Sequence, residues 1–417
     1  MRRDMSSSSR KLLCLALLVF AAAMVLSACG SSSGSSSSSS STTAEESEAG
    51  GESTPAAETE TEAEGEEAGG EEAGGGEDYS ALLKEATEVT PSKYEGPTEP
   101  APAKPGTKIA AISCAQTLQG CKEIAEGIEE AGEAAGVTVK VFDGQGETTT
   151  QNKQILNAIS WGAEAIILEA IDPTTVQTGL AAAQKAGIVV GGAVNGTNSP
   201  NKTRKPPAGD VWTSFDVGVD YKLAGEYEAS WIIADSEGKA NTVVYGTKEF
   251  PALPPQTEGV METLEACEGC TTDGPIYFLS SSLATNFGEE VVGYLRTHPE
   301  VEYIFCPYDP AAPAMVTAIE TAGLGEKVKL VSLLGNEQNL EFIRNEEVQA
   351  ADGSYDELYV GWAVVDQALR VLDGQKPFEP QGENIPFQLV DKNNLPPEGQ
   401  AYKAPFEFRP EFEKLWK

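Results

Sequence analysis

Four of the seven cysteines are spaced in pairs, and thiols so placed can form disulfides or carry redox chemistry. Cys114 and Cys121 connect the end of an expected strand to the start of an expected helix, and we predict a disulfide between them. Cys267 and Cys270 form a C-x-x-C pair that follows a helical pattern, whereas a redox-active pair normally begins a helix, whose N-terminus lowers the thiol pKa. We therefore predict a second structural disulfide there. Cys306 ends an apolar segment and is expected to be a small buried residue.

Residues suited to acid–base, nucleophilic or metal chemistry are scarce in this sequence. The chain has one histidine, His298, which argues against His-rich zinc sites and Ser-His-Asp catalysis. The sequence lacks G-x-x-x-x-G-K-[ST], G-x-S-x-G and H-E-x-x-H, and no G-x-G-x-x-G follows the first expected strand. We predict no catalytic residues, no metal site and no cofactor, and we do not expect an enzyme.

Polar and aromatic side chains near the ends of apolar segments are candidates for contact with a small-molecule ligand. These candidates are Gln116, Thr117, Gln119, Asn195, Trp212, Phe215, Tyr308, Asp309, Asn336 and Tyr355. Each has a structural alternative: solvation for the first loop, a turn for Asn195, core packing for Trp212 and Phe215. Asp309 precedes a proline and a helix, so it also fits a helix N-cap. Aromatic walls favour a ring-bearing or apolar ligand.

The elements that must position these residues alternate between apolar strands and helical patterns. Strands are expected at 108–114, 137–142, 165–169, 188–194, 241–245, 275–279, 302–306, 328–333, 348–352 and 385–390. Helices are expected at 122–135, 150–161, 173–186, 223–235, 257–266, 286–296, 311–322, 340–345 and 360–372. Continuous apolar strands are typical of parallel sheets covered on both faces. The sequence therefore predicts an α/β protein with two doubly wound, Rossmann-like lobes and a ligand cleft at the carboxyl ends of the strands.

The N-terminus has the pattern of an export signal. A basic segment, residues 1–11, precedes the apolar run LLCLALLVFAAAMVL, which is short for a membrane-spanning helix. We predict a signal peptide at 1–28. The tetrad LSAC resembles a bacterial lipobox, which implies that Cys29 is lipidated and becomes the mature N-terminus. The alternative is an uncleaved signal anchor.

The segment after the signal is rich in Ser, Glu, Gly and Pro. No basic residue stands between 30 and 78, and the segment cannot bury enough apolar surface to offset its conformational entropy. We predict a disordered tether at 29–104, in which 79–88 could form a short helix. With 29 basic against 65 acidic residues, the 417-residue chain carries a formal charge of −36. This charge argues against nucleic-acid binding and disfavours anionic ligands.

The ordered set of segments from about 108 to 391 resembles the type I periplasmic binding proteins, in their ribose-binding-like branch. The segments that carry the resemblance are VFDGQG, QILNAISWGAEAIILEAIDP, AAAQKAGIVV, TSFDVGVDYKLAGEYEASWI, LRTHPEVEYIFCPYDPAAPAMVTAIETAG and GWAVVDQALRVLDG. The resemblance implies an N-terminal lobe of 105–212 plus about 355–380. It also implies a C-terminal lobe of 213–354 plus about 381–417.

The implied function is that of a monomeric, lipid-anchored receptor on the extracytoplasmic face of the bacterial cell membrane. It would capture a small solute, sugar-like or other, and deliver it to the permease of an ABC importer. Signalling to a membrane sensor is an alternative, as are an enzyme on the same scaffold and a surface adhesin or spacer.

The sequence departs from the family where the sugar-binding members hold charged and polar clamps. Those positions correspond here to Val194 and Asn195, Gln256, Tyr308, and Leu334. The resemblance therefore implies the scaffold without the pentose clamp. We expect a neutral or cationic ligand with an apolar or ring portion, and not a free pentose or an anion.

Overall fold

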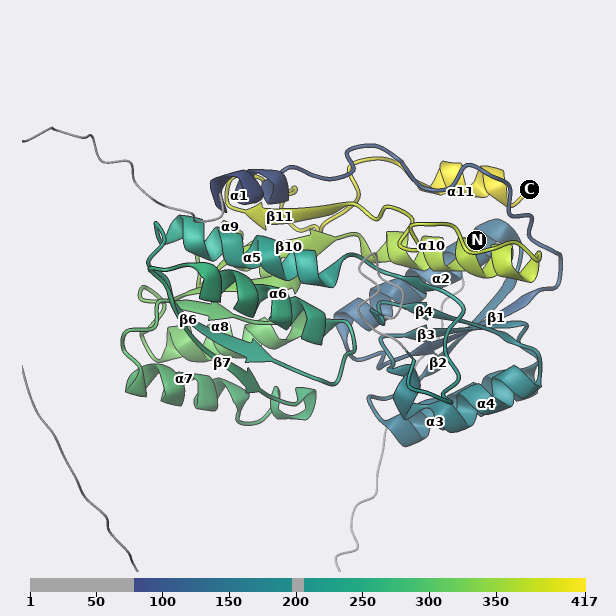
Figure 1. Ribbon diagram of the computed structural model, residues 1–417, viewed down its shortest axis with the longest axis horizontal. Helices are drawn as coiled ribbons and strands as arrows, with labels where there is room; N and C mark the ends of the chain where they lie inside the picture. The colour runs from purple at the N-terminus through teal and green to yellow at the C-terminus, as the bar shows by residue number, and fades with distance from the viewer. Residues whose placement is uncertain (1–78, 197–205) are drawn as a thin grey trace, which may run out of the picture. The chain divides into compact units, whose positions relative to one another are not determined.

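The computed structural model describes residues 79–196 and 206–417 (Figure 1). The predicted signal peptide at 1–28, the predicted lipidation site Cys29 and the tether up to residue 78 lie outside the described residues. Within the two described ranges, no helix combines the length and the apolar character needed to cross a membrane.

The first lobe contains a parallel sheet of order β2-β1-β3-β4-β5. Its strands are β1 (Lys108–Ser113), β2 (Thr138–Asp143), β3 (Ala165–Glu169), β4 (Val189–Ala193) and β5 (Asp216–Val217). The crossovers are α2 (Gln119–Ala135), α3 (Thr148–Trp161), and a 3-10 turn (Pro173–Thr175) followed by α4 (Gln177–Lys185). The central strand β3 is buried throughout, as expected for an apolar strand with helices on both faces.

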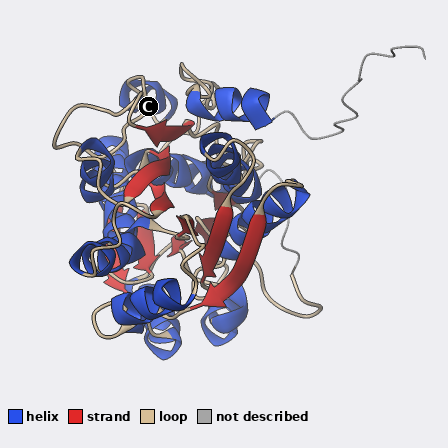
Figure 2. Cartoon of the chain, turned by 90° about the vertical axis from the view of Figure 1, so that its left-hand side faces the viewer, coloured by secondary structure: helices blue, strands red, loops and turns tan. Residues whose placement is uncertain are grey.

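The second lobe contains a sheet of order β11-β10-β9-β8-β6-β7, in which β11 pairs antiparallel with β10. Its strands are β6 (Asn241–Gly246), β7 (Thr271–Tyr277), β8 (Tyr303–Phe305), β9 (Lys329–Leu334), β10 (Gln349–Tyr355) and β11 (Phe387–Asp391). Its helices are α5 (Tyr221–Asp235), α6 (Leu253–Ala266), α7 (Phe287–Thr297), α8 (Ala312–Thr321) and α9 (Glu337–Arg344). In Figure 2 the strands lie between the surrounding helices. The predicted two-lobed α/β fold is confirmed.

The chain passes between the lobes more than once. Strand β5 extends the first sheet to Val217, so the first lobe continues past the expected boundary at 212. Helix α10 (Glu357–Leu372) follows β10 of the second sheet but packs on α2 of the first lobe. Most of α10 is buried, which explains why its sequence is apolar on nearly every side.

The chain ends depart from the expected boundaries. Helix α1 (Tyr79–Thr87) packs on α5, and the N–H of Ala101 donates a 2.8 Å hydrogen bond to the carbonyl of Leu415. Residues 79–104 are therefore part of the folded unit and not of a disordered tether, because their few apolar side chains find partners on it. Helix α11 (Arg409–Leu415) packs on α10, so the end of the chain returns to the first lobe and not to the second (Figure 1).

Both predicted disulfides are present. Cys114 and Cys121 are joined with their Cα atoms 6.2 Å apart, and Cys267 and Cys270 with theirs 5.4 Å apart. Among the described residues, Cys306 is a free and fully buried cysteine, as predicted.

Candidate functional site

A cavity of about 60 Å³ lies where the carboxyl ends of strands from both sheets meet. It is lined by Leu118, Gly120, Cys121, Ile124, Ala170, Val194, Tyr221, Phe250, Ala252, Leu253, Tyr308, Pro310, Leu334, Tyr355 and Glu357. The first lobe supplies the start of α2 and the residues that follow β3 and β4. The second lobe supplies the starts of α5 and α6 and the ends of β8, β9 and β10. This is the place at which open α/β sheets bind ligands.

Three lining residues have an unusual backbone. Ala170, Val194 and Leu334 have φ angles of 50°, 53° and 136°, although none of them is glycine. Ala170 and Val194 directly follow β3 and β4, and Leu334 is the last residue of β9. Such conformations cost about 1–3 kcal/mol each and concentrate at functional sites. For the β-branched Val194 the conformation is especially unfavourable.

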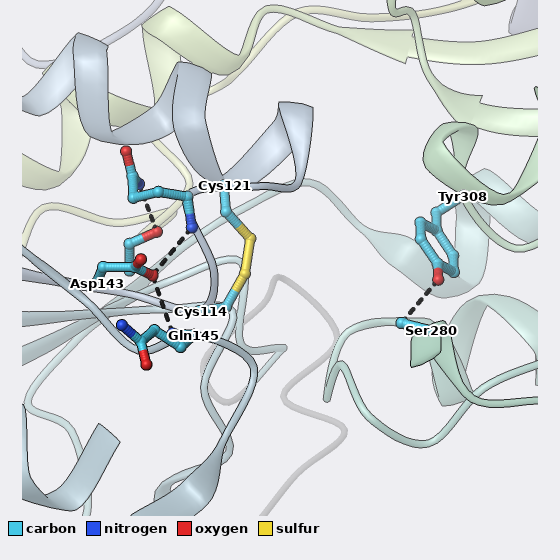
Figure 3. Close-up of a disulfide and its surroundings, with 8 residues drawn as sticks. Cys114, Cys121, Asp143, Gln145, Ser280 and Tyr308 are labelled. Atoms are coloured by element: carbon cyan, nitrogen blue, oxygen red, sulfur yellow. Dashed lines mark hydrogen bonds between the residues drawn. A yellow bond between two sulfur atoms is a disulfide. The ribbon is translucent and has the colours of Figure 1, made fainter. Parts of the chain in front are cut away.

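Tyr308 contributes an aromatic wall to the cavity. Its side chain is almost fully buried, stacks on Phe278 with ring centroids 6.0 Å apart and meets Phe250 edge to face at 5.4 Å. The hydroxyl group forms a hydrogen bond with Ser280, drawn in Figure 3, and its oxygen is 2.9 Å from Oγ of Ser280. The ring is therefore held in one position, and its hydroxyl already has a partner.

Tyr355 and Tyr221 form a second aromatic pair. Tyr355 ends β10 and Tyr221 begins α5, and their hydroxyl oxygens are 3.3 Å apart. Both rings are buried and meet edge to face at 6.4 Å. Burial raises the pKa of both hydroxyls, so they remain neutral at physiological pH.

Glu357 is the one carboxyl-bearing side chain among the described residues that line the cavity. It is the first residue of α10 and is 2% exposed. Asn336 Nδ2 donates a 3.3 Å hydrogen bond to its Oε2, while no donor in the described ranges reaches Oε1. A Cβ atom added at Gly120 would lie 2.5 Å from Oε1, so a larger residue there would force the carboxyl group to shift. Burial, and then the Glu123 carboxylate, raise the pKa of Glu357 well above its usual value.

The predicted contacts of the first loop do not line this cavity. The N–H of Gln116 donates to Asp143 (3.1 Å), and its side-chain amide donates to Ser113 Oγ at 2.7 Å. Thr117 is exposed. Gln119 is the first residue of α2, and its side-chain amide donates a hydrogen bond to the carboxylate of Glu123. The same loop nevertheless reaches the cavity through Leu118 and Cys121. Figure 3 shows the disulfide that joins Cys121 to Cys114.

Other predicted contacts are placed in the protein interior. Asn195 is fully buried and donates from Nδ2 to the carbonyl of Leu168 at 2.9 Å. Phe215 is fully buried in the core, and neither it nor Trp212 lines the cavity. Gln256, at one of the lost clamp positions, is buried and donates to Glu228 at 2.8 Å.

Asp309 belongs to a buried polar network behind the cavity. Its carboxylate accepts hydrogen bonds from Ser332 Oγ at 2.5 Å and from the N–H of Asn336 at 2.7 Å. Ser332 also contacts Asp352 Oδ2 at 3.1 Å. Burial and the neighbouring Asp352 raise the pKa of Asp309. The expected N-cap role is wrong, because Asp309 is the first residue of a 3-10 turn whose N-cap is Tyr308.

Of the predicted residues, the structure thus brings Tyr308 and Tyr355 to the cavity lining. Asn336 does not line the cavity but hydrogen-bonds to the lining residue Glu357. Sequence reasoning missed Tyr221, Phe250 and Glu357. Tyr221 and Glu357 each follow an aspartate N-cap, so their positions at helix starts could have been predicted from the sequence. The sequence did not indicate which helix starts face the cleft. The described residues contain no cluster of His, Cys, Asp and Glu arranged to hold a metal ion.

Residues 109–376 match the family described as periplasmic binding protein domain, and the chain belongs to this family. It is 24% identical over 257 residues to the ribose import binding protein RbsB of Bacillus subtilis, covering 60% of this chain and 77% of the relative. It is 27% identical over 259 residues to the periplasmic protein TorT of Escherichia coli K12, covering 60% and 68%.

A solved structure has the same fold. It is an ABC transporter solute-binding protein from Mycobacterium smegmatis with bound glycerol, which aligns with a TM-score of 0.61 and 18% identity. The alignment covers 71% of this chain and 99% of that protein. At this identity the likeness defines the architecture: the protein has the type I periplasmic-binding-protein fold.

Proposed function

We propose that this protein is an extracytoplasmic solute receptor that captures a small molecule between its lobes and delivers it to an ABC importer. The observation that carries this proposal is that one cavity is lined by strand ends and helix starts of both lobes. A ligand bound there contacts both lobes and stabilises their closed arrangement. Binding, and not catalysis, is the proposed role, in keeping with the family to which the chain belongs.

The lipid anchor at Cys29, a monomeric state and delivery to a permease are parts of the same proposal. A receptor tethered to the outer face of the cell membrane stays near the importer it serves. The relatives leave a second role open, since one is named for ribose import and the other simply as a periplasmic protein. Signalling to a membrane sensor is therefore the alternative role. An uptake assay in a strain that lacks this protein separates the two: loss of solute uptake supports delivery to an importer, and unchanged uptake supports signalling.

Ligand capture is tested by mass spectrometry of solutes retained by the purified full chain, followed by calorimetric titration with the retained solute. Tyr308→Ala removes an aromatic wall and should weaken binding about tenfold or more. Tyr277→Ala is the matched control, because Tyr277 is half exposed and does not line the cavity. Equal binding by both variants, or no solute bound by the intact protein, would contradict the proposed site.

A further inference from the structure

The cavity has the wrong polarity for a ligand covered in hydroxyl groups. Apart from Glu357, its side-chain polar groups among the described residues are the three tyrosine hydroxyls and the disulfide-bonded Cys121. The hydroxyls of Tyr221 and Tyr355 face each other, and that of Tyr308 faces Ser280. A polyhydroxylated ligand would therefore be buried with few partners, and each unpaired polar group costs about 1–3 kcal/mol.

The cavity lining contains an acidic side chain and no basic one among the described residues. No lysine, arginine or histidine of the described ranges lines it, whereas Glu357 does. The groups that act on Glu357 electrostatically are Glu123 on α2 and, at the surface, Lys403 in the C-terminal segment. An anion placed here would meet a carboxyl group and no cationic side chain of the described residues. The chain's net charge of −36 adds long-range attraction for cations.

Oε1 of Glu357 is the one unsatisfied carboxylate oxygen lining this cavity in the described structure. Its partner oxygen Oε2 accepts from Asn336, whereas no amide, hydroxyl or ammonium donor of the described residues reaches Oε1, although the residue is only 2% exposed. The neighbouring Glu123 carboxyl group hydrogen-bonds to Glu357 only when one of the two carboxyls holds a proton. A buried carboxylate oxygen without a donor is costly, and an ammonium group supplies both a donor and the opposite charge.

We propose that the ligand is an organic cation: a small amine whose ammonium group binds Oε1 of Glu357 and whose apolar body lies against Tyr308, Phe250 and Ile124. This proposal rests on the proposed function, because it assigns the ligand class of the same cavity. The aromatic rings suit both parts of such a ligand, since they pack against apolar surface and attract cations.

The test compares ligands of one shape that differ in charge. Benzylamine, benzyl alcohol, benzoate and ribose are titrated calorimetrically into the full chain. Benzylamine should bind about tenfold or more tightly than benzyl alcohol, and benzoate and ribose should bind more weakly still. Glu357→Gln, which keeps the shape and the acceptor for Asn336, should remove the preference for the amine. Glu129→Gln removes the same charge from an exposed position on α2 and should leave it unchanged.

Each other outcome overturns the proposal. Equal affinity for the amine and the alcohol, or an unchanged amine affinity in Glu357→Gln, shows that Glu357 is not the counter-charge. If ribose or benzoate binds best and Tyr308→Ala abolishes that binding, the cavity is a solute site and only the ligand class is wrong. If no probe binds and no solute is retained, the proposed function fails together with the ligand class.

Discussion

Asn336 and Glu357 connect the two lobes directly. Asn336 is the N-cap of α9 in the second lobe, and its Nδ2 donates a 3.3 Å hydrogen bond to Oε2 of Glu357, which begins the α10 helix that packs on the first lobe. Both residues are at most 5% exposed. The contact therefore fixes the carboxylate of the cavity and the relative position of two helix starts.

Replacement of Asn336 should weaken both stability and ligand binding. Asn336→Ala leaves a second oxygen of the buried Glu357 carboxylate without a donor, at a cost of about 1–3 kcal/mol. Thermal unfolding and titration with the retained solute measure the two effects. Asn345→Ala is the control, because Asn345 ends the same helix in an exposed position. If the two variants behave alike, the hydrogen bond to Glu357 contributes nothing.

The disulfide between Cys114 and Cys121 should stabilise the first loop and the start of α2. The two cysteines are separated by 7 positions in the sequence. For a loop of this size, the loss of chain entropy in the unfolded state predicts a stabilisation of about 2–3 kcal/mol. Because Cys121 also lines the cavity, the double variant Cys114→Ser with Cys121→Ser should lose ligand affinity as well as stability. The corresponding double variant at Cys267 and Cys270, which lie outside the cavity, should lose stability without losing affinity. Equal loss of affinity in both variants would contradict this separation.

The regular part of the fold could be predicted from the sequence because its strands are continuous apolar runs that alternate with helices. Strand β5 was missed, since two residues leave no hydrophobic pattern. The sequence analysis did not predict that residues 79–104 are folded. Single apolar residues in this segment, such as Ala101, are buried by contacts with the C-terminus, which is distant in sequence. Such contacts depend on the complete tertiary structure.

The lining of the cavity was predicted only in part. Tyr308 follows β8 and Tyr355 ends β10, so both lie at the carboxyl edge of the second sheet. Phe215 instead directly precedes β5, and its ring packs over Gly191 on β4, where any side chain would clash with it. Glu357 could not be singled out, because the chain has 65 acidic residues and only packing of α10 against α2 shows which one is buried at the cavity.

Lipidation of Cys29 can be tested in the native host. Cys29→Ala removes the thiol that would carry the lipid, so the protein should leave the membrane fraction or keep its signal peptide uncleaved. Cell fractionation with immunoblotting measures both results, and Cys14→Ala, which alters the apolar run without touching the predicted site, is the control. Membrane association that is unchanged in Cys29→Ala would instead support an uncleaved signal anchor.

Several buried carboxyl groups give stability an unusual dependence on pH. Glu169, Glu228, Glu357 and Glu383 are at most 2% exposed, and burial raises the pKa of each well above the usual value of 4.5. Between 4.5 and the raised pKa values, the folded state holds protons that the unfolded state has released. Folding therefore takes up protons in this range, and stability falls as pH rises through it.

The free energy of unfolding of the ligand-free protein should accordingly increase as pH is lowered from 8 towards 5. Glu228→Gln keeps the buried contact with Gln256 but cannot take up a proton. The free energy of unfolding of this variant should therefore depend less steeply on pH, by up to about 1.4 kcal/mol per pH unit, which corresponds to one proton. Urea unfolding at successive pH values measures the slope, with exposed Glu129→Gln as the control. A stability that rises with pH would contradict the predicted uptake of protons on folding. Identical slopes in the two variants would show that Glu228 does not hold an extra proton in the folded protein.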